Sequence, residues 1–383
     1  MRFIHTGDWH LGRSLHGVSL VADQAWWLER FVELVRGQRP DAVVIAGDVY
    51  DRAVPPADAV ALLDDTLVTI VRDLGVPVVL VAGNHDSPER VGFGSRMFSA
   101  AGLYVAGELG SEVSSVVIGA GEGATRFWLL PYADPIETRD ALGEAAAGVH
   151  DHEAAVALLL DGVRGAGATE PYQLLVTHHF VAGGIASESE RGLTVGGTGS
   201  VGTPVFDGFD YVALGHLHRR QTLADGRIHY PGSALAYAFD EAGTRKAVSI
   251  VTLGAGAPQI ETVELGARRA VRRLAGSYED VLLRAAADDS RDDYLEIELA
   301  EDVMPPDALG RLREWYPNLL SLRRRQDALL PDDDSALERT HVERLTDDVL
   351  YERFFGYVTG EDMAVEQRAT LHELLDRKSG GDR

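Results

Sequence analysis

Residues 42–48, Ala-Val-Val-Ile-Ala-Gly-Asp, and residues 78–86, Val-Val-Leu-Val-Ala-Gly-Asn-His-Asp, show the pattern that decides the fold. In each stretch a short apolar run ends in glycine and then in polar, chemistry-bearing residues. Such a run is typical of a strand buried on both faces, and the helical patterns at 23–36 and 58–72 predict helices between the strands. The sequence therefore predicts an α/β fold with polar residues just past the carboxyl ends of the strands, where open α/β sheets place their ligands.

The same pattern recurs in three other places along the chain. Polar clusters follow predicted strands at Thr6-Gly7-Asp8-Trp9-His10, Thr177-His178-His179 and Gly215-His216-Leu217-His218. Asp-x-His and His-x-His place two side chains on one side of a strand end, because the strand period is two. Aspartate, asparagine and histidine are ligands that suit manganese, zinc or iron. Five such clusters predict a phosphoesterase with two metal ions, in which a carboxylate such as Asp48 bridges the ions and the pair clamps a phosphate.

Composition limits the class of protein. The chain has 383 residues, of which 45% are hydrophobic and 25% charged, as in ordinary globular proteins of two or three domains. It has no cysteine, which excludes disulfides, thiolate metal sites and cysteine nucleophiles. We expect no membrane span, no signal peptide and a cytoplasmic location. The net charge of -24 argues against a nucleic-acid partner, but only weakly, because bound metals add local positive charge.

The pattern of the chain changes after about residue 265. Alternation at 293–299, a helical pattern at 306–315 and an apolar run at 319–322 predict a small α+β domain. Two helical patterns follow at 336–357 and 361–378. We therefore expect three parts, residues 1–265, 266–330 and 331–383. The glycine-rich stretch 183–204 predicts a long loop, which in a compact domain is more often functional than accidental.

The order of the polar clusters resembles that of the calcineurin-like metallophosphoesterases. Narrower motifs resemble the SbcD-type nucleases of that family over essentially the whole chain, and they lie at Thr6 to Gly12, Gly47 to Pro56, Phe180 to Gly184, Ser187 to Arg191, Val195 to Gly197, Ala213 to His218, Tyr230 to Ser233 and Phe239 to Glu241. The resemblance implies a four-layer α/β/β/α sandwich of two mixed sheets. It also implies that residues 266–330 form a capping domain that positions DNA, and that helices in 331–383 bind an SbcC-type ATPase.

The resemblance further implies roles for single residues. One ion would be held by Asp8, His10 and His218, the other by Asn84, His178 and His216, with Asp48 as the bridge. His85 would stabilise charge near the scissile phosphate or protonate the leaving oxygen. His179 would pack or support a ligand. No cofactor other than the two ions is expected.

Asp51 and Arg52 belong to the pattern Gly-Asp-x-x-Asp-Arg, which related protein phosphatases share. We expect the Asp51 carboxylate to accept a hydrogen bond from His85 and so fix its tautomer, as carboxylates behind functional histidines do. We expect Arg52 to contact a DNA phosphate. An ordinary salt-bridged turn is the alternative interpretation of both residues.

The function implied by the resemblance is that of a metal-dependent DNA nuclease subunit in DNA repair, recombination and replication. It would act as an exonuclease on duplex ends and as an endonuclease on single-stranded or hairpin DNA, with two copies of each subunit in the complex; a homodimer of the chain fits the same expectation. Manganese is favoured over magnesium because several ligands are imidazoles. The alternatives are a cyclic-nucleotide phosphodiesterase of the same fold and a DNA-end scaffold with little activity. Candidate arginines for contact with the DNA backbone are Arg90, Arg96, Arg191, Arg219 and Arg220, and a solvated or salt-bridged role explains each of them at least as well.

Overall fold

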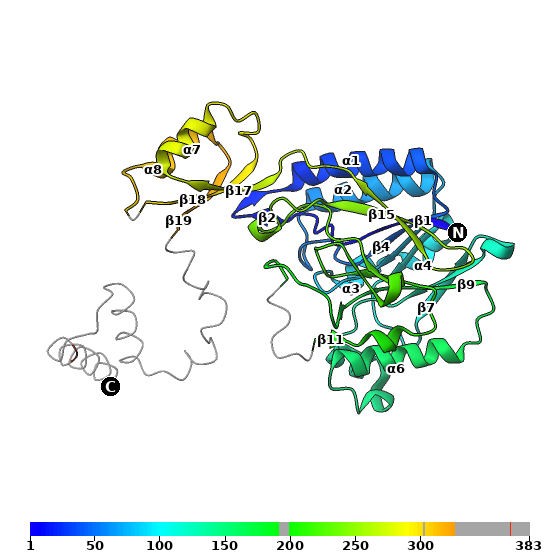
Figure 1. Ribbon diagram of the computed structural model, residues 1–383. Helices are drawn as coiled ribbons and strands as arrows, with labels where there is room; N and C mark the ends of the chain where they lie inside the picture. The colour runs from blue at the N-terminus through cyan, green and yellow to red at the C-terminus, as the bar shows by residue number, and fades with distance from the viewer. Residues whose placement is uncertain (191–198, 302, 326–367, 369–383) are drawn as a thin grey trace. The chain divides into compact units, whose positions relative to one another are not determined.

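A computed structural model describes residues 1–190, 199–301, 303–325 and 368. Residues Met1–Arg324 form one compact unit, in which two six-stranded sheets carry the main fold. Helices cover the outer face of each sheet, α1 and α2 on one and α6 on the other (Figure 1). The four-layer α/β/β/α sandwich implied by the family resemblance is therefore confirmed.

The first sheet has the strand order β16-β15-β1-β4-β5-β6. Its strands are β1 (Arg2–Thr6), β4 (Ala42–Ala46), β5 (Val78–Val81), β6 (Leu103–Ala106), β15 (Ala247–Thr252) and β16 (Gln259–Glu264). The first four are parallel, whereas β15 pairs antiparallel with β1 and β16, so the sheet is mixed. The helices on its outer face are α1 (Val21–Gln38) and α2 (Ala57–Val68), which continues as one π-helical turn at Thr69–Asp73.

The second sheet has the strand order β13-β14-β12-β9-β8-β7. Its strands are β7 (Ser114–Ile118), β8 (Thr125–Leu129), β9 (Tyr172–His178), β12 (Tyr211–Gly215), β13 (Gln221–Leu223) and β14 (Ile228–Tyr230). Helices α5 (Pro135–Leu142) and α6 (His152–Gly165) follow β8 in the chain. Helix α6 begins where the Asp151 side chain accepts a hydrogen bond from the Ala154 N–H, and it buries a stripe of residues three and four apart, namely Ala155, Val156, Leu159, Leu160 and Val163.

The two sheets share a core that explains the unbroken apolar runs in the sequence. Phe3 and Val44 from the first sheet belong to the same buried cluster as Val176 and Tyr211 from the second, and the Phe3 and Tyr211 ring centroids lie 5.5 Å apart. Neighbouring residues of β4, such as Val43, pack on the opposite face against the helices. Every residue of β4 is buried because both faces of the strand are covered.

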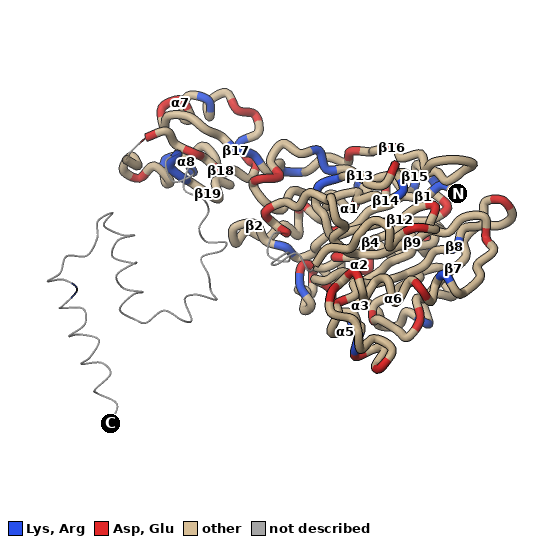
Figure 2. Tube along the Cα trace, turned by 60° about the horizontal axis from the view of Figure 1, so that its bottom comes forward, with Lys and Arg blue, Asp and Glu red and all other residues tan. Residues whose placement is uncertain are grey.

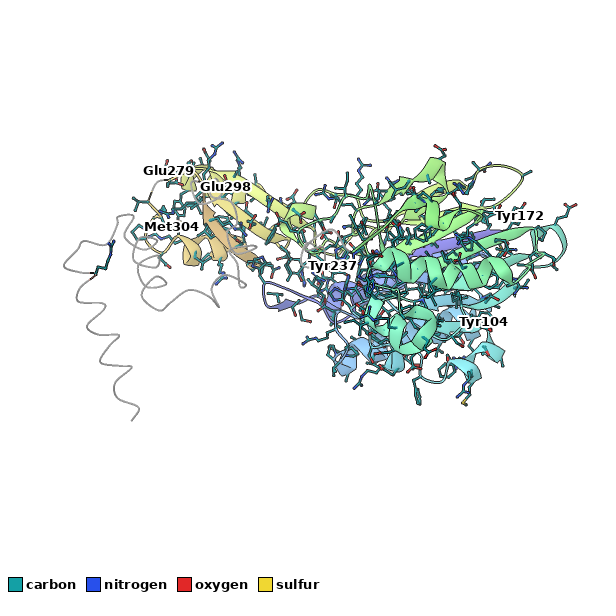
Figure 3. All side chains as sticks on the ribbon, turned by 90° about the horizontal axis from the view of Figure 1, so that it is seen from below. Tyr104, Tyr172, Tyr237, Glu279, Glu298 and Met304 are labelled. Carbon is teal, nitrogen blue, oxygen red and sulfur yellow. The ribbon has the colours of Figure 1, made fainter. Side chains whose placement is uncertain are left out.

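Within this compact unit, a smaller group of elements with its own core follows the sandwich in the chain. It consists of β17 (Val271–Gly276), α7 (Tyr278–Ala285), β18 (Tyr294–Leu299), α8 (Ala308–Trp315) and β19 (Leu319–Arg324), with all three strands parallel. Leu295 and Ile297 of β18 pack with Val281 of α7 and Leu312 of α8. Figure 3 marks Glu279, Glu298 and Met304 in this unit. The sequence predicted β18, α8 and β19 but missed β17 and α7, because β17 carries two arginines that break the apolar pattern.

Short elements complete the described fold. They are β2 (Ser14–Leu15), β3 (Val18–Ser19), β10 (Phe180–Val181), β11 (Ser200–Val201), α3 (Pro88–Val91) and α4 (Ser95–Phe98). None of the described helices is both long enough and apolar enough to cross a membrane. Some predictions fall outside the described residues. They are Arg191, the helical patterns at 336–357 and 361–378, and the partner-binding part at 331–383, of which only Arg368 is described. The three-part division of the chain stays a prediction.

Candidate metal centre

The loops after five strands meet at one edge of the sandwich. The loops after β1, β4 and β5 bring Asp8, His10, Asp48 and Asn84 from the first sheet, and the ends of β9 and β12 bring His178, His216 and His218 from the second. All of these side chains are buried except that of Asn84, which is half-buried. The structure thus brings together all seven residues that the sequence singled out as metal ligands. They form two groups, joined by Asp48.

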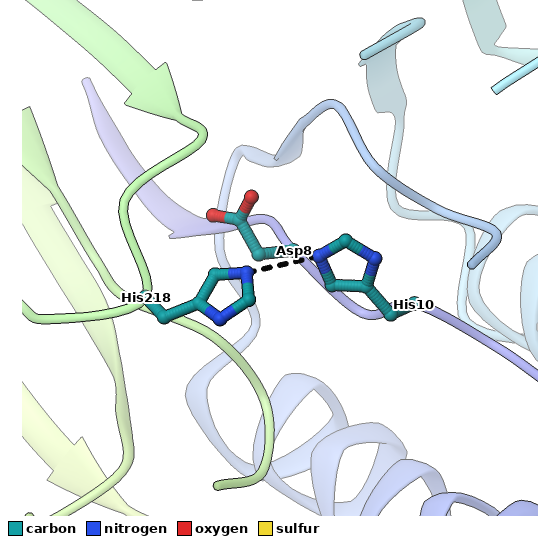
Figure 4. A group of neighbouring side chains, drawn as sticks. All are labelled: Asp8, His10 and His218. Carbon is teal, nitrogen blue, oxygen red and sulfur yellow. Dashed lines mark hydrogen bonds between the residues drawn. The ribbon is translucent and has the colours of Figure 1, made fainter. Parts of the chain in front are cut away.

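The first half-site consists of Asp8, His10 and His218 (Figure 4). The Nε2 atoms of His10 and His218 lie 3.0 Å apart. Asp8 Oδ1 accepts a hydrogen bond from the His216 N–H, while Asp8 Oδ2 is buried and has no partner among the described residues. A buried carboxylate oxygen without a donor is costly, and its position beside two converging ring nitrogens fits a divalent cation.

The second half-site consists of Asn84, His178 and His216. Asn84 Oδ1 lies 3.1 Å from Nε2 of His178 and 3.0 Å from Nδ1 of His216. The other ring nitrogen of His178, Nδ1, lies 2.8 Å from the main-chain oxygen of Ala46 and donates to it. This hydrogen bond leaves Nε2 of His178 unprotonated in the neutral ring, which is the form that binds a metal ion.

Asp48 lies between the two half-sites. Its Oδ2 atom is 3.6 Å from Nε2 of His10 and 3.3 Å from Nε2 of His178. Its Oδ1 atom accepts a hydrogen bond from the His85 N–H at 2.9 Å. One carboxylate oxygen thus faces both groups while the other is held by the main chain, which is the arrangement that a bridging ligand requires.

The charges of the metal-free centre depend on burial and on Asp48. Burial raises the pKa of Asp8 to about 6 and lowers that of His216 to about 3. Burial also disfavours the charged form of His178, but the adjacent Asp48 outweighs it and raises the His178 pKa to about 9. Burial of Asp48 acts to raise the pKa of its carboxyl, but His178 and His10 outweigh burial and hold that pKa well below its usual value. The metal-free centre therefore holds protons that bound cations would displace.

Backbone geometry at the strand ends allows the ligands to converge. Asp8, His10, Asp48 and His216 all have positive φ, at 51°, 44°, 48° and 99°. Such conformations cost about 1–3 kcal/mol each in non-glycine residues and cluster at functional sites. At Gly215 a side chain is excluded altogether, because a β-carbon there would lie 1.9 Å from the Ala46 oxygen and 2.8 Å from Nδ1 of His178.

His85 is half-buried at the margin of the centre. Its ring packs edge-on against His10, with centroids 4.8 Å apart, and its Nδ1 lies 2.9 Å from an oxygen of Asp51. That oxygen belongs to the main chain, so the expectation that the Asp51 carboxylate accepts from His85 is wrong. The carboxylate instead pairs with Arg13 at 3.2 Å, and the same oxygen lies 3.8 Å from Nδ1 of His10. Arg52 is exposed and forms no ion pair with the described residues.

His179 is excluded as a ligand by its own hydrogen bonds. Nε2 of His179 accepts from the Ala133 N–H at 3.0 Å, and its Nδ1 lies 3.0 Å from the Thr177 hydroxyl. Both ring nitrogens are engaged, and the ring stacks on Tyr132. His179 therefore packs beneath the centre, while its neighbour His178 points into it.

Sequence reasoning missed two residues that hold the ligand loops. The Asp86 carboxylate accepts from the N–H groups of Gly83, Tyr50 and Val49, and so ties the Asn84 loop to the Asp48 loop. Asp86 lies inside the quoted Gly-Asn-His-Asp motif, so a signal for it existed. Gln24 of α1 gave no signal, although its amide donates to the carbonyls of Trp9 and His10 while its oxygen accepts from the Gly12 N–H.

Comparisons with known proteins indicate the family to which the chain belongs. A family model for calcineurin-like phosphoesterases matches residues 1–220, and one for the type 5 capsule protein repressor C-terminal domain matches residues 267–359. The SbcD subunit of the nuclease SbcCD from Staphylococcus saprophyticus is 32% identical over 98% of this chain and 98% of its own length. The chain belongs to the SbcD family of calcineurin-like phosphoesterases. For this SbcD-family chain the predicted family and the predicted class of enzyme, a metal-dependent phosphoesterase, are confirmed.

The solved structures to which the SbcD-family chain is similar show lower identity. A dimetal phosphatase from Danio rerio is 17% identical with a TM-score of 0.46, and the match covers 70% of this chain and 96% of the other. The protein TT1561 of Thermus thermophilus is 12% identical with a TM-score of 0.41, covering 69% of this chain and 99% of the other. Membership of the family implies divalent metal ions, and two buried groups in this chain could hold them, Asp8 with His10 and His218, and Asp8 with Asp48 and His178.

Proposed function

We propose that the chain is the nuclease subunit of an SbcCD-type complex and hydrolyses phosphodiester bonds in DNA. The observation that carries the proposal is the position of Asp48 between two half-sites of buried ligands, in a chain that aligns over 98% of its length with the SbcD subunit of a nuclease SbcCD. Exonuclease action on duplex ends and endonuclease action on single-stranded or hairpin DNA, in repair, recombination and replication, belong to the same proposal.

Two divalent ions, when bound, would supply Lewis-acid charge for the phosphate and for the attacking water. We assign one ion to the first half-site, the other to the second, and the bridge to Asp48. Four of the seven ligands are histidines, which favours manganese over magnesium. The chain's own contribution is to hold these ligands in place and to remove water from around them, since six of the seven side chains are buried.

His85 is proposed as the group that acts on the phosphate itself. Its Nδ1–H donates to the Asp51 main-chain oxygen, so Asp51 orients the ring through its backbone and leaves Nε2 available. In its doubly protonated form the His85 ring can use the Nε2–H to stabilise charge on the phosphate or to protonate the leaving oxygen. The Arg52 side chain, exposed in the same loop as Asp48, is proposed to contact a DNA phosphate.

The partner and the assembly are also proposals. An SbcC-type ATPase would bind the helices in 331–383 and control access to DNA, with two copies of each subunit in the complex. The unit at 266–330 would help to position the DNA. Acidic and basic residues are interspersed along the described chain (Figure 2), and Arg90, Arg96 and Arg220 are exposed near the site loops. These arginines, the ions and the partner would together offset the net charge of -24. We place this complex in the cytoplasm with the DNA.

The test is degradation of an end-labelled blunt DNA duplex in manganese, with and without the SbcC-type partner and ATP. We expect cleavage that requires manganese, that is stimulated by the partner and that is absent in Asp8→Ala. Glu144→Gln, an exposed substitution distant from the ligand loops in sequence, serves as the matched control. No cleavage in either condition, together with turnover of a small phosphodiester, would instead indicate a cyclic-nucleotide phosphodiesterase.

A further inference from the structure

Two motifs distinguish this sequence from simpler phosphoesterases, yet the phosphoester chemistry above gives them no role. They are Ser187 to Glu190, in the loop after β10, and Phe239 to Glu241, a short 3-10 turn before β15. The structure brings both motifs to the same place, behind His218 of the first half-site. The side chains of Ser187, Glu190 and Glu241 are buried there.

A hydrogen-bonded chain runs away from the ring of His218. Nδ1 of His218 lies 2.7 Å from the Ser189 hydroxyl, and that hydroxyl lies 2.8 Å from Oε1 of Glu241. A carboxylate only accepts, so the Ser189 O–H donates to Glu241 and its oxygen accepts from the His218 Nδ1–H. With its proton on Nδ1, the neutral ring presents an unprotonated Nε2 to Asp8 and His10.

Lys246 closes the far end of this chain. Its ammonium donates to Oε2 of Glu241, to the Ser233 hydroxyl at 2.8 Å and to the main-chain oxygen of His218 at 2.8 Å. The three acceptors match the three donors of an ammonium group. The planar fork of an arginine side chain is wider and cannot point three donors at one compact cluster. Lys246 is the only lysine among the described residues, and Lys378 is the other lysine of the sequence, so 34 of its 36 basic residues are arginine.

Glu190 holds the main chain of His218 from the other side. One oxygen of its carboxylate accepts from the His218 N–H, and the other accepts from the Ser187 N–H at 2.9 Å. The His218 residue is therefore fixed at its ring, its N–H and its carbonyl by three separate side chains. Such support commonly raises metal affinity by about 10–100-fold, because it removes the freedom that a ligand would lose on binding.

We propose that Ser189, Glu241 and Lys246 are positioning residues, which fix His218 in the tautomer that presents Nε2 to a divalent cation. They would thereby set the affinity of the ion held by Asp8, His10 and His218, and leave the ion of the second half-site unaffected. The proposal rests on the ligand assignment made under the proposed function. It gives the Ser-Glu-Ser-Glu and Phe-Asp-Glu motifs a physical role.

The test measures manganese binding rather than catalysis. The full chain is freed of metal with a chelator and titrated with Mn²⁺ by isothermal titration calorimetry. We expect Ser189→Ala, Glu241→Gln and Lys246→Arg each to lower the affinity for one of the two ions by about 10–100-fold and the affinity for the other by less than about threefold. Ser189→Thr keeps a hydroxyl and is expected to bind both ions as the wild type does.

Matched controls are Ser111→Ala and Glu144→Gln, both at exposed positions, which should leave both affinities unchanged. Circular dichroism of the metal-free variants checks that they are folded; Ser189→Ala removes one hydroxyl only and keeps the test decisive if Lys246→Arg does not fold. Wild-type affinity in Ser189→Ala and Glu241→Gln would overturn the proposal. His218→Ala separates a failure of this proposal from a failure of the proposed function. If this variant also binds both ions with wild-type affinity, the ligand assignment itself is wrong.

Discussion

Each half-site combines two histidines with one oxygen ligand, Asp8 in the first and Asn84 in the second, but the two half-sites are supported in different ways. In the second half-site, His178 donates its Nδ1–H to a main-chain oxygen, that of Ala46 at the end of β4. In the first, His218 donates to the side chain of Ser189, and behind it lie Glu241 and Lys246. Main-chain support is part of the fold and is present whenever the sheets pack. Side-chain support depends on single residues, so the first half-site is the one that substitutions can tune.

The largest effect is expected where the two half-sites meet. Asp48→Ala removes the one carboxylate that faces both, so both ions should bind weakly. Several kcal/mol of charge stabilisation would be lost, which corresponds to at least about 10³-fold in the rate of DNA hydrolysis. Hydrolysis rate and Mn²⁺ stoichiometry would be measured together. Full function of the complex with this variant would revive the interpretation of the chain as a DNA-end scaffold.

The next effect concerns the main-chain support alone. In Gly215→Ala the new β-carbon would overlap the Ala46 oxygen and press on His178, so the strand ends must separate. We expect a loss of about 1–3 kcal/mol in the free energy of unfolding and weaker binding of the second ion only. Urea unfolding and Mn²⁺ titration measure these quantities. Gly254→Ala, where a β-carbon meets nothing within 4 Å, is the control. Equal losses in both variants would refute the steric explanation.

A smaller effect is expected from Gln24, which supports the first half-site from α1. Gln24→Ala leaves the Gly12 N–H and the His10 carbonyl without this partner, at about 1–3 kcal/mol for an unsatisfied buried group. The first ion should bind more weakly while the second keeps its affinity. Thermal unfolding and Mn²⁺ titration measure the two effects, with the exposed Gln259→Ala as control. If only the second ion bound more weakly in Gln24→Ala, the assignment of Gln24 to the first half-site would be wrong.

The smallest expected effect is a difference between the two half-sites in the number of protons released when metal binds. The pKa of His178 near 9 means that the metal-free second half-site carries a proton at pH 7.5, which a cation must displace. Asp8, with a pKa near 6, is already ionised at that pH. Calorimetry in buffers of different ionisation enthalpy should therefore show release of about one proton, and His178→Ala should abolish it. Proton release that persists in His178→Ala would assign the proton elsewhere.

The same shifts predict how the stability of the metal-free chain depends on pH. The raised pKa of His178 contributes stability that is complete below its unfolded value of about 6.5 and is lost as pH rises through about 9. The raised pKa of Asp8 acts likewise between about pH 4 and 6. The midpoint of thermal unfolding in chelator should fall from pH 6.5 to 9. The fall should be smaller in His178→Ala, and an equal fall would contradict the assignment.

The sequence predicted the ligands better than their supports. Asp8, His10 and the other candidate ligands follow apolar strands at fixed spacing, and a periodic pattern is local information. Gln24 contacts His10 only because α1 folds back onto the strand ends, and no local pattern records that return. For the same reason Ser189 and Glu241, 52 residues apart, were visible as motifs but not as neighbours. Strand β17 was missed because two arginines interrupt its apolar pattern.

Each half-site draws its ligands from both sheets, and this affects how long the chain survives as well as how fast it works. A cation that binds only when the sheets are packed stabilises the folded state by mass action, by about 2.7 kcal/mol when its free concentration is 100 times its dissociation constant. That is a large part of the roughly 5–15 kcal/mol that holds a folded protein together. When free metal becomes scarce, more of the chain unfolds and is exposed to proteases. Metal supply would thus govern the abundance of the protein, and not only its activity.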